Sequence, residues 1–167
     1  MSGKETDVGK HGRQDRLIQE RVHDPYMKAS KPVELTVCPE CGVVFSGGRW
    51  QWQQDAPEAA QKQWCPACQR IRDKVPAGFL TLSGEFFNEH RDEIMSLIHN
   101  KEQEQKGQHP MKRLMKIEDQ EGGGITITFT DMHLPRGIGQ AIERAYEGEL
   151  DIQYTKEAGI LRVYWQR

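Results

Sequence analysis

The sequence predicts the α+β fold class, with a small cysteine-bearing module placed before a larger domain of strands and helices. Three observations support this prediction. Two C-x-x-C pairs lie within residues 38–68, several short segments alternate apolar with polar residues, and two longer segments carry apolar residues at helical spacing. In chain order, the segments of the larger domain give β-α-β-β-α-β-β.

The chain begins with a polar segment. Residues 1–32 show little apolar periodicity and carry seven basic residues against five acidic ones. We therefore expect a mobile N-terminal arm. Two interpretations stand for it: a solubilising tail, or an arm that orders on RNA or protein.

Residues 33–78 are predicted to form a zinc-ribbon module. Alternating apolar and polar residues indicate a strand at 33–37, and two more short strands are expected at 43–45 and 50–52 around a glycine turn. The composition of residues 55–63 permits a short helix.

Residues 79–167 are predicted to form a compact α+β domain. Five segments have the composition or the alternation of strands, at residues 79–82, 111–118, 125–130, 150–154 and 161–165. Two segments have helical spacing, one from about 84 to 105 and one between Asp131 and Gly148. This order predicts a ferredoxin-like α/β sandwich with one extra terminal strand, in which helices lie on one face of an antiparallel sheet.

The four cysteines are predicted to hold one metal ion. Cys38, Cys41, Cys65 and Cys68 form two C-x-x-C turns, and each turn places two sulfurs on one side of a tight loop. Four thiolates suit structural Zn²⁺ and saturate it, which leaves no position for a reacting water. Iron is the alternative, since C-P-x-C turns resemble those of rubredoxin.

Several function classes find no support in the sequence. The chain has no apolar leader and no apolar run near the roughly 18 residues that span a membrane, so we expect a cytoplasmic protein without a membrane partner. It also lacks a phosphate-binding glycine loop, a dinucleotide fingerprint and a G-x-S-x-G motif. We therefore expect no catalytic residues, no small-molecule substrate and no enzyme activity.

Charge is distributed unevenly along the chain. The net charge of −2 argues against a strongly basic nucleic-acid binder. Residues 1–78 nevertheless carry 12 basic against 10 acidic residues, whereas residues 79–167 carry 11 against 15. Basic or aromatic residues are candidates for RNA contact, namely Arg49, Trp50, Trp52, Arg70, Arg72, Lys74, Lys112, Arg113 and Lys116.

Each group of candidates has a simpler interpretation. At least two of Trp50, Trp52 and Trp64 are expected to supply the small core of the ribbon. The basic residues around Lys112 fit an edge strand protected by charge. The basic residues after Cys68 fit an ordinary solvated surface.

The phrases CPECG, GRWQW and CPACQRIRD, followed by PAGFLTLSGEFFNEHRDEI, resemble an uncharacterised family of small bacterial proteins with a CPxCG…CPxC ribbon. The resemblance continues to the end of the chain and covers about residues 34–167. A more distant resemblance is to the N-terminal half of the export adaptor of the large ribosomal subunit and its archaeal relatives, which bind pre-ribosomal particles. That resemblance implies metal binding by the four cysteines and matches Ile125 to Tyr154 to a strand-helix-strand segment. This chain departs from the adaptor in having one recognisable C-x-x-C/C-x-x-C site.

Together these features lead us to expect a non-enzymatic zinc-binding protein that associates with the ribosome or structured RNA. The first alternative is a protein–protein adaptor or regulator with a purely structural ribbon and no RNA role. A redox protein or enzyme is a further alternative, and a coloured iron centre would distinguish it from colourless zinc.

Replacing one cysteine tests the metal site directly. Cys65→Ser should lose the metal and unfold residues 33–78 while residues 79–167 stay folded, because metal coordination contributes on the order of 10 kcal/mol in such modules. Metal analysis and thermal unfolding measure both effects. Unchanged metal content and an unchanged melting curve would contradict the assignment.

Overall fold

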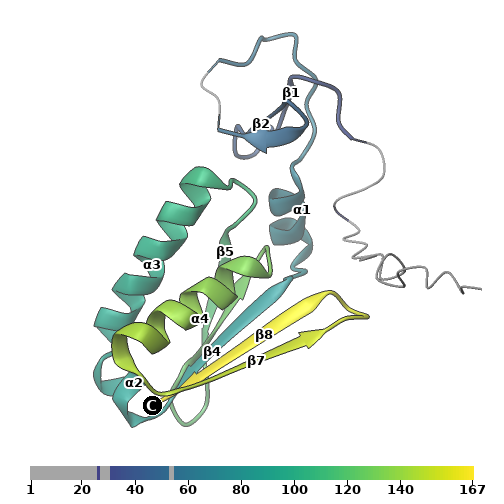
Figure 1. Cartoon of the computed structure of the whole chain (residues 1–167). Coiled ribbons are helices and arrows are strands. Elements are labelled where there is room, and N and C mark those ends of the chain that lie inside the picture. Colours follow the sequence, from purple (N-terminus) through teal and green to yellow (C-terminus); the bar gives the residue numbers. More distant parts are fainter. Residues whose placement is uncertain (1–25, 27–30, 53–54) are drawn as a thin grey trace, which may run out of the picture.

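The computed structural model describes residue 26 and residues 31–52 and 55–167 (Figure 1). The predicted N-terminal arm at 1–32 therefore lies almost entirely outside the described residues. Within them, a three-stranded antiparallel sheet precedes a five-stranded mixed sheet with helices, which confirms the α+β class. No helix in this part of the chain is long and apolar enough to cross a membrane.

The small sheet is a meander of β1 (Thr36–Val37), β2 (Val44–Ser46) and β3 (Arg49–Gln51). Gly47 and Gly48 join β2 to β3 with φ values of 62° and 79°, which glycine adopts without steric cost. Phe45 and Trp50 are paired across these strands, and their rings meet edge to face with centroids 5.5 Å apart.

Helix α1 (Pro66–Asp73) begins at the second cysteine pair. Residues 55–63, whose composition permits a helix, instead contain turns and an isolated bridge between Lys62 and Val37. The Cys65 sulfur accepts a hydrogen bond from the Cys68 N–H at 3.4 Å, and Pro66 occupies the first turn, where no backbone donor is needed. The cysteine turn therefore supplies the start of the helix.

The larger domain follows the predicted order of elements, with one break. Its elements are β4 (Gly78–Ser83), α2 (Glu85–Glu89), α3 (Arg91–Gln108), β5 (Leu114–Asp119), β6 (Ile125–Phe129), α4 (His133–Tyr146), β7 (Glu149–Thr155) and β8 (Ile160–Gln166). The single helix predicted from about 84 to 105 is two helices, because the backbone at His90 (φ −110°, ψ 21°) leaves the helical conformation.

The predicted antiparallel pairing of the large sheet is wrong at one strand pair. The strand order is β5-β6-β4-β8-β7, and β4 pairs with β8 in parallel. In a ferredoxin-like sheet, β7, the strand that follows α4, would lie beside β4. Here β7 forms the edge of the sheet, and β8 lies between β7 and β4. The outward positions of β7, including Glu149 and Asp151, are polar and suit an edge, whereas β8 buries Leu161, Val163 and Trp165.

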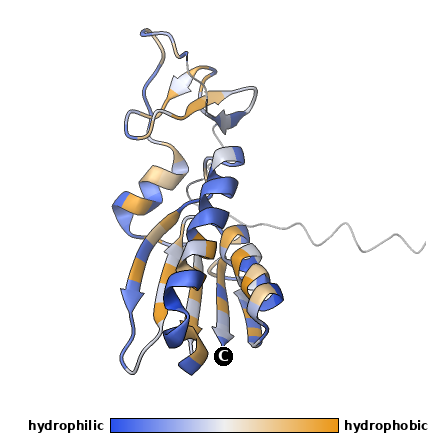
Figure 2. Cartoon of the chain, turned by 90° about the vertical axis from the view of Figure 1, so that its left-hand side faces the viewer, coloured by the Kyte–Doolittle hydropathy of each residue, from blue (hydrophilic) through white to orange (hydrophobic). Residues whose placement is uncertain are grey.

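The main core lies between the large sheet and the helices that cover one of its faces (Figure 1). The fully buried side chains include Leu80, Leu82, Phe87, Ile94, Ile98, Ile125, Ile127, Phe129, Ile142, Val163 and Trp165. Hydrophobic and hydrophilic residues alternate along the strands and around the helices (Figure 2). The opposite face of the sheet carries polar pairs such as Thr81 and Thr126, whose hydroxyls are 3.2 Å apart.

Two glycines of α4 provide a matched test of this packing. A Cβ on Gly139 would lie 2.7 Å from Val163 Cγ1 and 3.1 Å from Leu150 Cδ1, whereas a Cβ on Gly137 meets nothing within 4 Å. Gly139→Ala should therefore lower the free energy of unfolding by about 1–3 kcal/mol through overpacking. Gly137→Ala should raise it by about 0.5–1 kcal/mol, because alanine favours the helix. Urea unfolding measures both, and equal effects would refute the packing described.

Candidate metal centre

Four cysteine sulfurs converge where the small sheet meets α1. Cys38, Cys41, Cys65 and Cys68 place their Sγ atoms within 4.8 Å of one another. The Cys41 and Cys65 sulfurs are 3.8 Å apart, and a tetrahedron with metal–sulfur bonds of about 2.3 Å has edges of roughly 3.8 Å. The predicted ligand set is thus brought together, and it can hold one metal ion such as zinc.

Local hydrogen bonds shape the first cysteine turn. The Cys38 N–H donates to the Val43 carbonyl and the Gly42 N–H donates to the Cys38 carbonyl, both at 2.9 Å. Gly42 has φ 80°, a conformation that side chains disfavour, so glycine permits the sharp bend after Cys41.

The segment before the second turn is tied to the first by backbone bonds. The Val37 N–H donates to the Gln61 carbonyl at 2.7 Å, and the Gln63 N–H donates to the Val37 carbonyl at 3.0 Å. These bonds place Cys65 directly beside Cys38. Trp50, Trp64 and Met111 pack against the small core that contains the buried cysteines.

Arg113 reaches the cluster from the larger domain. Its Nη1 lies 3.2 Å from the Cys68 sulfur, and its Nη2 lies 3.1 Å from that of Cys41 and 3.7 Å from that of Cys65. The residue is 6% exposed. Four thiolates around a divalent ion leave a net charge of −2, so a buried guanidinium that donates to three of them reduces the remaining charge.

The position of Arg113 is fixed by its surroundings at the start of β5. Its Nε donates to the Pro110 carbonyl at 2.8 Å. Its backbone N–H donates to the Thr130 hydroxyl at 2.9 Å, and its carbonyl accepts from the Thr130 N–H at 2.9 Å. The Thr130 hydroxyl donates in turn to the Met111 carbonyl at 2.6 Å. These bonds hold Arg113 so that its guanidinium faces the sulfurs.

Without a metal the cysteines hold their protons unequally. The hydrogen bond from Cys65, with help from Arg113, lowers the pKa of Cys41 to about 4. The same bond and burial raise the pKa of Cys65, and burial raises the pKa of Cys68 to about 11. Metal binding requires thiolates, so the charge of Arg113 favours the metal-bound form.

The three tryptophans of the ribbon differ in exposure. Trp50 and Trp64 are half-buried against the sulfur cluster, whereas Trp52 is 41% exposed. The Trp52 indole N–H donates to the Lys106 carbonyl near the end of α3 at 2.8 Å, and the Arg113 guanidinium lies 5.6 Å from the Trp52 ring centroid.

A cleft of about 720 Å³ lies between the ribbon and the loop that follows α3. Aromatic and basic residues line much of it, including Lys31, Arg49, Trp50, Trp52, His109 and Lys112. Three of the RNA-contact candidates from the ribbon and one from the larger domain thus share one concave surface.

The basic candidates on α1 lie elsewhere and differ in exposure. Arg70 is buried, donates to the Val75 carbonyl at 3.0 Å, and its guanidinium lies 4.7 Å from the Tyr26 ring centroid. Lys74 is exposed at the end of the helix. Because Arg70 and Arg113 are enclosed by protein, we leave both out of the RNA surface proposed below.

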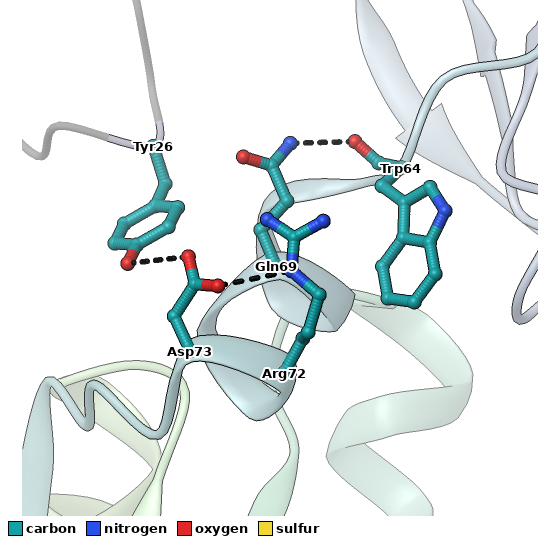
Figure 3. A network of polar contacts seen from close by, with 5 residues as sticks. All are labelled: Tyr26, Trp64, Gln69, Arg72 and Asp73. Carbon is teal, nitrogen blue, oxygen red and sulfur yellow. Dashed lines mark hydrogen bonds and ion pairs between the residues drawn. The ribbon is translucent and has the colours of Figure 1, made fainter.

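Arg72 is exposed but belongs to a surface network (Figure 3). Its Nε donates to Asp73 at 2.9 Å, and the Tyr26 hydroxyl donates to the other Asp73 oxygen at 3.1 Å. The Arg72 hydrogen bond lowers the pKa of the Asp73 carboxyl. Gln69 donates to the Trp64 carbonyl at 2.7 Å, and Arg72 stacks over the Trp64 ring with 5.0 Å between the guanidinium carbon and the centroid.

The third basic group is not one surface. Lys112 lines the cleft and its Nζ lies 3.4 Å from Gln105 Oε1. Lys116 lies on the outer strand β5 and forms an ion pair with Glu118 at 2.5 Å. Arg113 points into the metal centre. Sequence reasoning identified Arg113 as a basic residue but missed its contact with the sulfurs, since 45 residues separate it from Cys68.

Comparisons with models of known protein families, with curated proteins and with solved structures found no match to this chain. The resemblances to a bacterial ribbon family and to the ribosomal export adaptor therefore stay expectations.

Removing the guanidinium tests its role at the cluster. Arg113→Met should weaken metal binding by about 10- to 100-fold, as loss of outer hydrogen bonds to metal ligands usually does. Arg113→Lys keeps the positive charge but loses the planar guanidinium. Its metal affinity should lie between those of the unmodified chain and Arg113→Met. A competition titration with a chromophoric chelator measures the affinity.

Lys116→Met is the control for loss of a positive charge close to Arg113 in the chain. It should leave the affinity unchanged, because Lys116 pairs with Glu118 at the surface. Equal affinity for metal in Arg113→Met and in the unmodified chain would show that the guanidinium contributes only packing.

Proposed function

We propose that this chain is a non-enzymatic zinc protein that associates with the ribosome or with structured RNA. The observation that carries the RNA part is the concave surface on which Lys31, Arg49 and Lys112 lie together with Trp50 and Trp52. Basic side chains attract the phosphate backbone, and an exposed aromatic ring such as that of Trp52 can stack on a base. The chain as a whole has a net charge of −2, so it does not attract RNA through its overall charge. Basic and aromatic residues gathered in one place therefore favour a local RNA-binding surface.

Zinc is the proposed ion because of the donor set. Four thiolates in a tetrahedral arrangement suit zinc and leave it no open position, which supports a scaffolding role over hydrolysis. We place the protein in the cytoplasm, where reducing conditions keep thiolates available to the metal. Iron remains the alternative that metal analysis and absorption in the visible range distinguish.

The metal and the proposed RNA surface belong to one structural unit. Trp50 lies in β3 and packs against the small core that contains the buried cysteines, and Trp52 is the first residue after that strand. A metal that orders the ribbon therefore also positions the residues that would contact RNA. No reaction is assigned to the metal in this proposal.

A second function, a protein–protein adaptor, is favoured by a different observation. Ile71 and Val75 are 41% and 42% exposed at and just after the end of α1. Large apolar side chains exposed at a surface suit contact with a protein partner. An adaptor of this kind predicts partner capture that nuclease does not affect and that does not fall with salt as RNA binding does.

Sedimentation tests the RNA proposal. The protein should sediment with ribosomal particles through a sucrose gradient at low salt and should be released as salt increases, because phosphate contacts weaken. Lys112→Glu should reduce the fraction of protein bound to the particles. It should also make the binding constant less dependent on salt, by the amount expected for the loss of about one phosphate contact. Lys156→Glu makes the same charge change in the β7–β8 turn, outside the cleft, and should do neither.

A protein that stays at the top of the gradient at low salt, in lysates of both growing and stationary cells, would rule out ribosome association. Co-purification that survives nuclease treatment would favour the adaptor instead.

A further inference from the structure

We infer that the cleft between the ribbon and the loop after α3 binds single-stranded RNA, with an unpaired base stacked on Trp52 and the flanking phosphates held by Arg49 and Lys112. This inference rests on the proposed RNA function and names its site and its class of ligand. Cavities that bind small ligands usually measure about 300–1,000 Å³, and this cleft has a volume of about 720 Å³.

Trp52 is built as a stacking platform. It is 41% exposed, yet its indole N–H is already bonded to the Lys106 carbonyl at 2.8 Å. The ring is thus held in place through its polar edge while part of its surface stays open. A ring that is ordered before binding loses little conformational entropy when a base stacks on it.

Trp50, two residues before Trp52, is itself held in place. Trp50 meets Phe45 edge to face across β2 and β3, and Trp50 also packs against the sulfur cluster. Arg113, which donates to three of the sulfurs, lies 5.6 Å from the Trp52 ring centroid. The position of Trp52 is therefore tied to the metal centre.

The charges of the lining suit a polyanion. Lys31, Arg49 and Lys112 are basic, and Asp131 is the one acidic residue among the described residues that line the cleft. The Asp131 carboxylate already accepts a hydrogen bond from the Leu134 N–H at 2.7 Å. Within the described part of the chain, Lys31 and Arg49 have no ion-pair partner, and Lys112 contacts only the neutral amide of Gln105.

The shape and chemistry of the cleft favour single strands over duplex RNA. In a duplex the bases stack on one another and their faces are not available to a protein ring. Proteins that bind single strands combine a basic groove with aromatic rings on which bases stack, and the residues of this cleft supply both.

The test uses the full chain with its metal bound and a fluorescein-labelled twelve-nucleotide RNA, either alone or annealed to its complement. Fluorescence anisotropy at low salt measures the two affinities. The single strand should bind more tightly than the duplex. Trp52→Ala should weaken single-strand binding by about 5- to 150-fold, which is the value of one stacked base.

Trp52→Phe is the matched variant, because it loses the hydrogen bond to Lys106 but keeps an aromatic ring. It should bind more tightly than Trp52→Ala, so a difference between the two variants reports stacking rather than folding. Tyr164→Ala removes an exposed ring from the open face of the large sheet and should change nothing. Thermal unfolding of each variant confirms that it is folded.

Two results would overturn the inference: single-strand binding by Trp52→Ala as tight as in the unmodified chain, or duplex binding that is as tight as single-strand binding. If either occurs while the unmodified chain still sediments with ribosomal particles in a salt-dependent way, the proposed RNA function stands and only this site is wrong. If the unmodified chain binds neither RNA nor ribosomes, both proposals fail.

Discussion

The arrangement of this chain depends on the convergence of four sulfur atoms, because the module that carries them is too small to fold by burying apolar side chains alone. Its longest strands have three residues. The sulfurs nevertheless lie within 4.8 Å of one another, and Cys38 and Cys65 are fully buried. A metal ion at this point would contribute on the order of 10 kcal/mol, far more than such strands supply. The small sheet, the start of α1 and the position of the ribbon tryptophans all follow from that point.

Arg113 joins this centre to the larger domain. A buried guanidinium needs negative partners, and removing them would leave a charge whose burial costs several kcal/mol. Because the sulfurs of the ribbon are those partners, loss of the metal should also be felt at the start of β5, where Thr130 and Pro110 hold the arginine. Arg113 therefore couples the two parts of the chain, which the Trp52 hydrogen bond to the Lys106 carbonyl also joins. The Arg113 guanidinium also lies 5.6 Å from the centroid of the Trp52 ring, which lines the cleft. The position of that ring therefore depends on the cysteine cluster as well.

In the large sheet, tertiary packing decides whether β7 or β8 pairs with β4. Both strands of the last hairpin alternate apolar with polar residues, so either can pair with β4 as far as local pattern is concerned. The structure places β8 inside and β7 at the edge. Leu161, Val163 and Trp165 are thereby buried under α4, while the Tyr154 side chain of β7 stays 45% exposed. Greater burial of apolar surface favours this order and makes the sheet mixed.

The sequence by itself determined the set of four cysteines that could hold a metal ion, the α+β class and most of the elements. Cysteine spacing and apolar periodicity are local properties, and they act over a few residues regardless of the rest of the fold. Only the tertiary structure decided the parallel pairing of β4 with β8, the enclosure of Arg70, and the contact of Arg113 with sulfurs up to 72 positions away. It also decided which basic and aromatic residues share a cleft. These features depend on which surfaces meet when the ribbon packs against the larger domain, and no local pattern of residues encodes that packing.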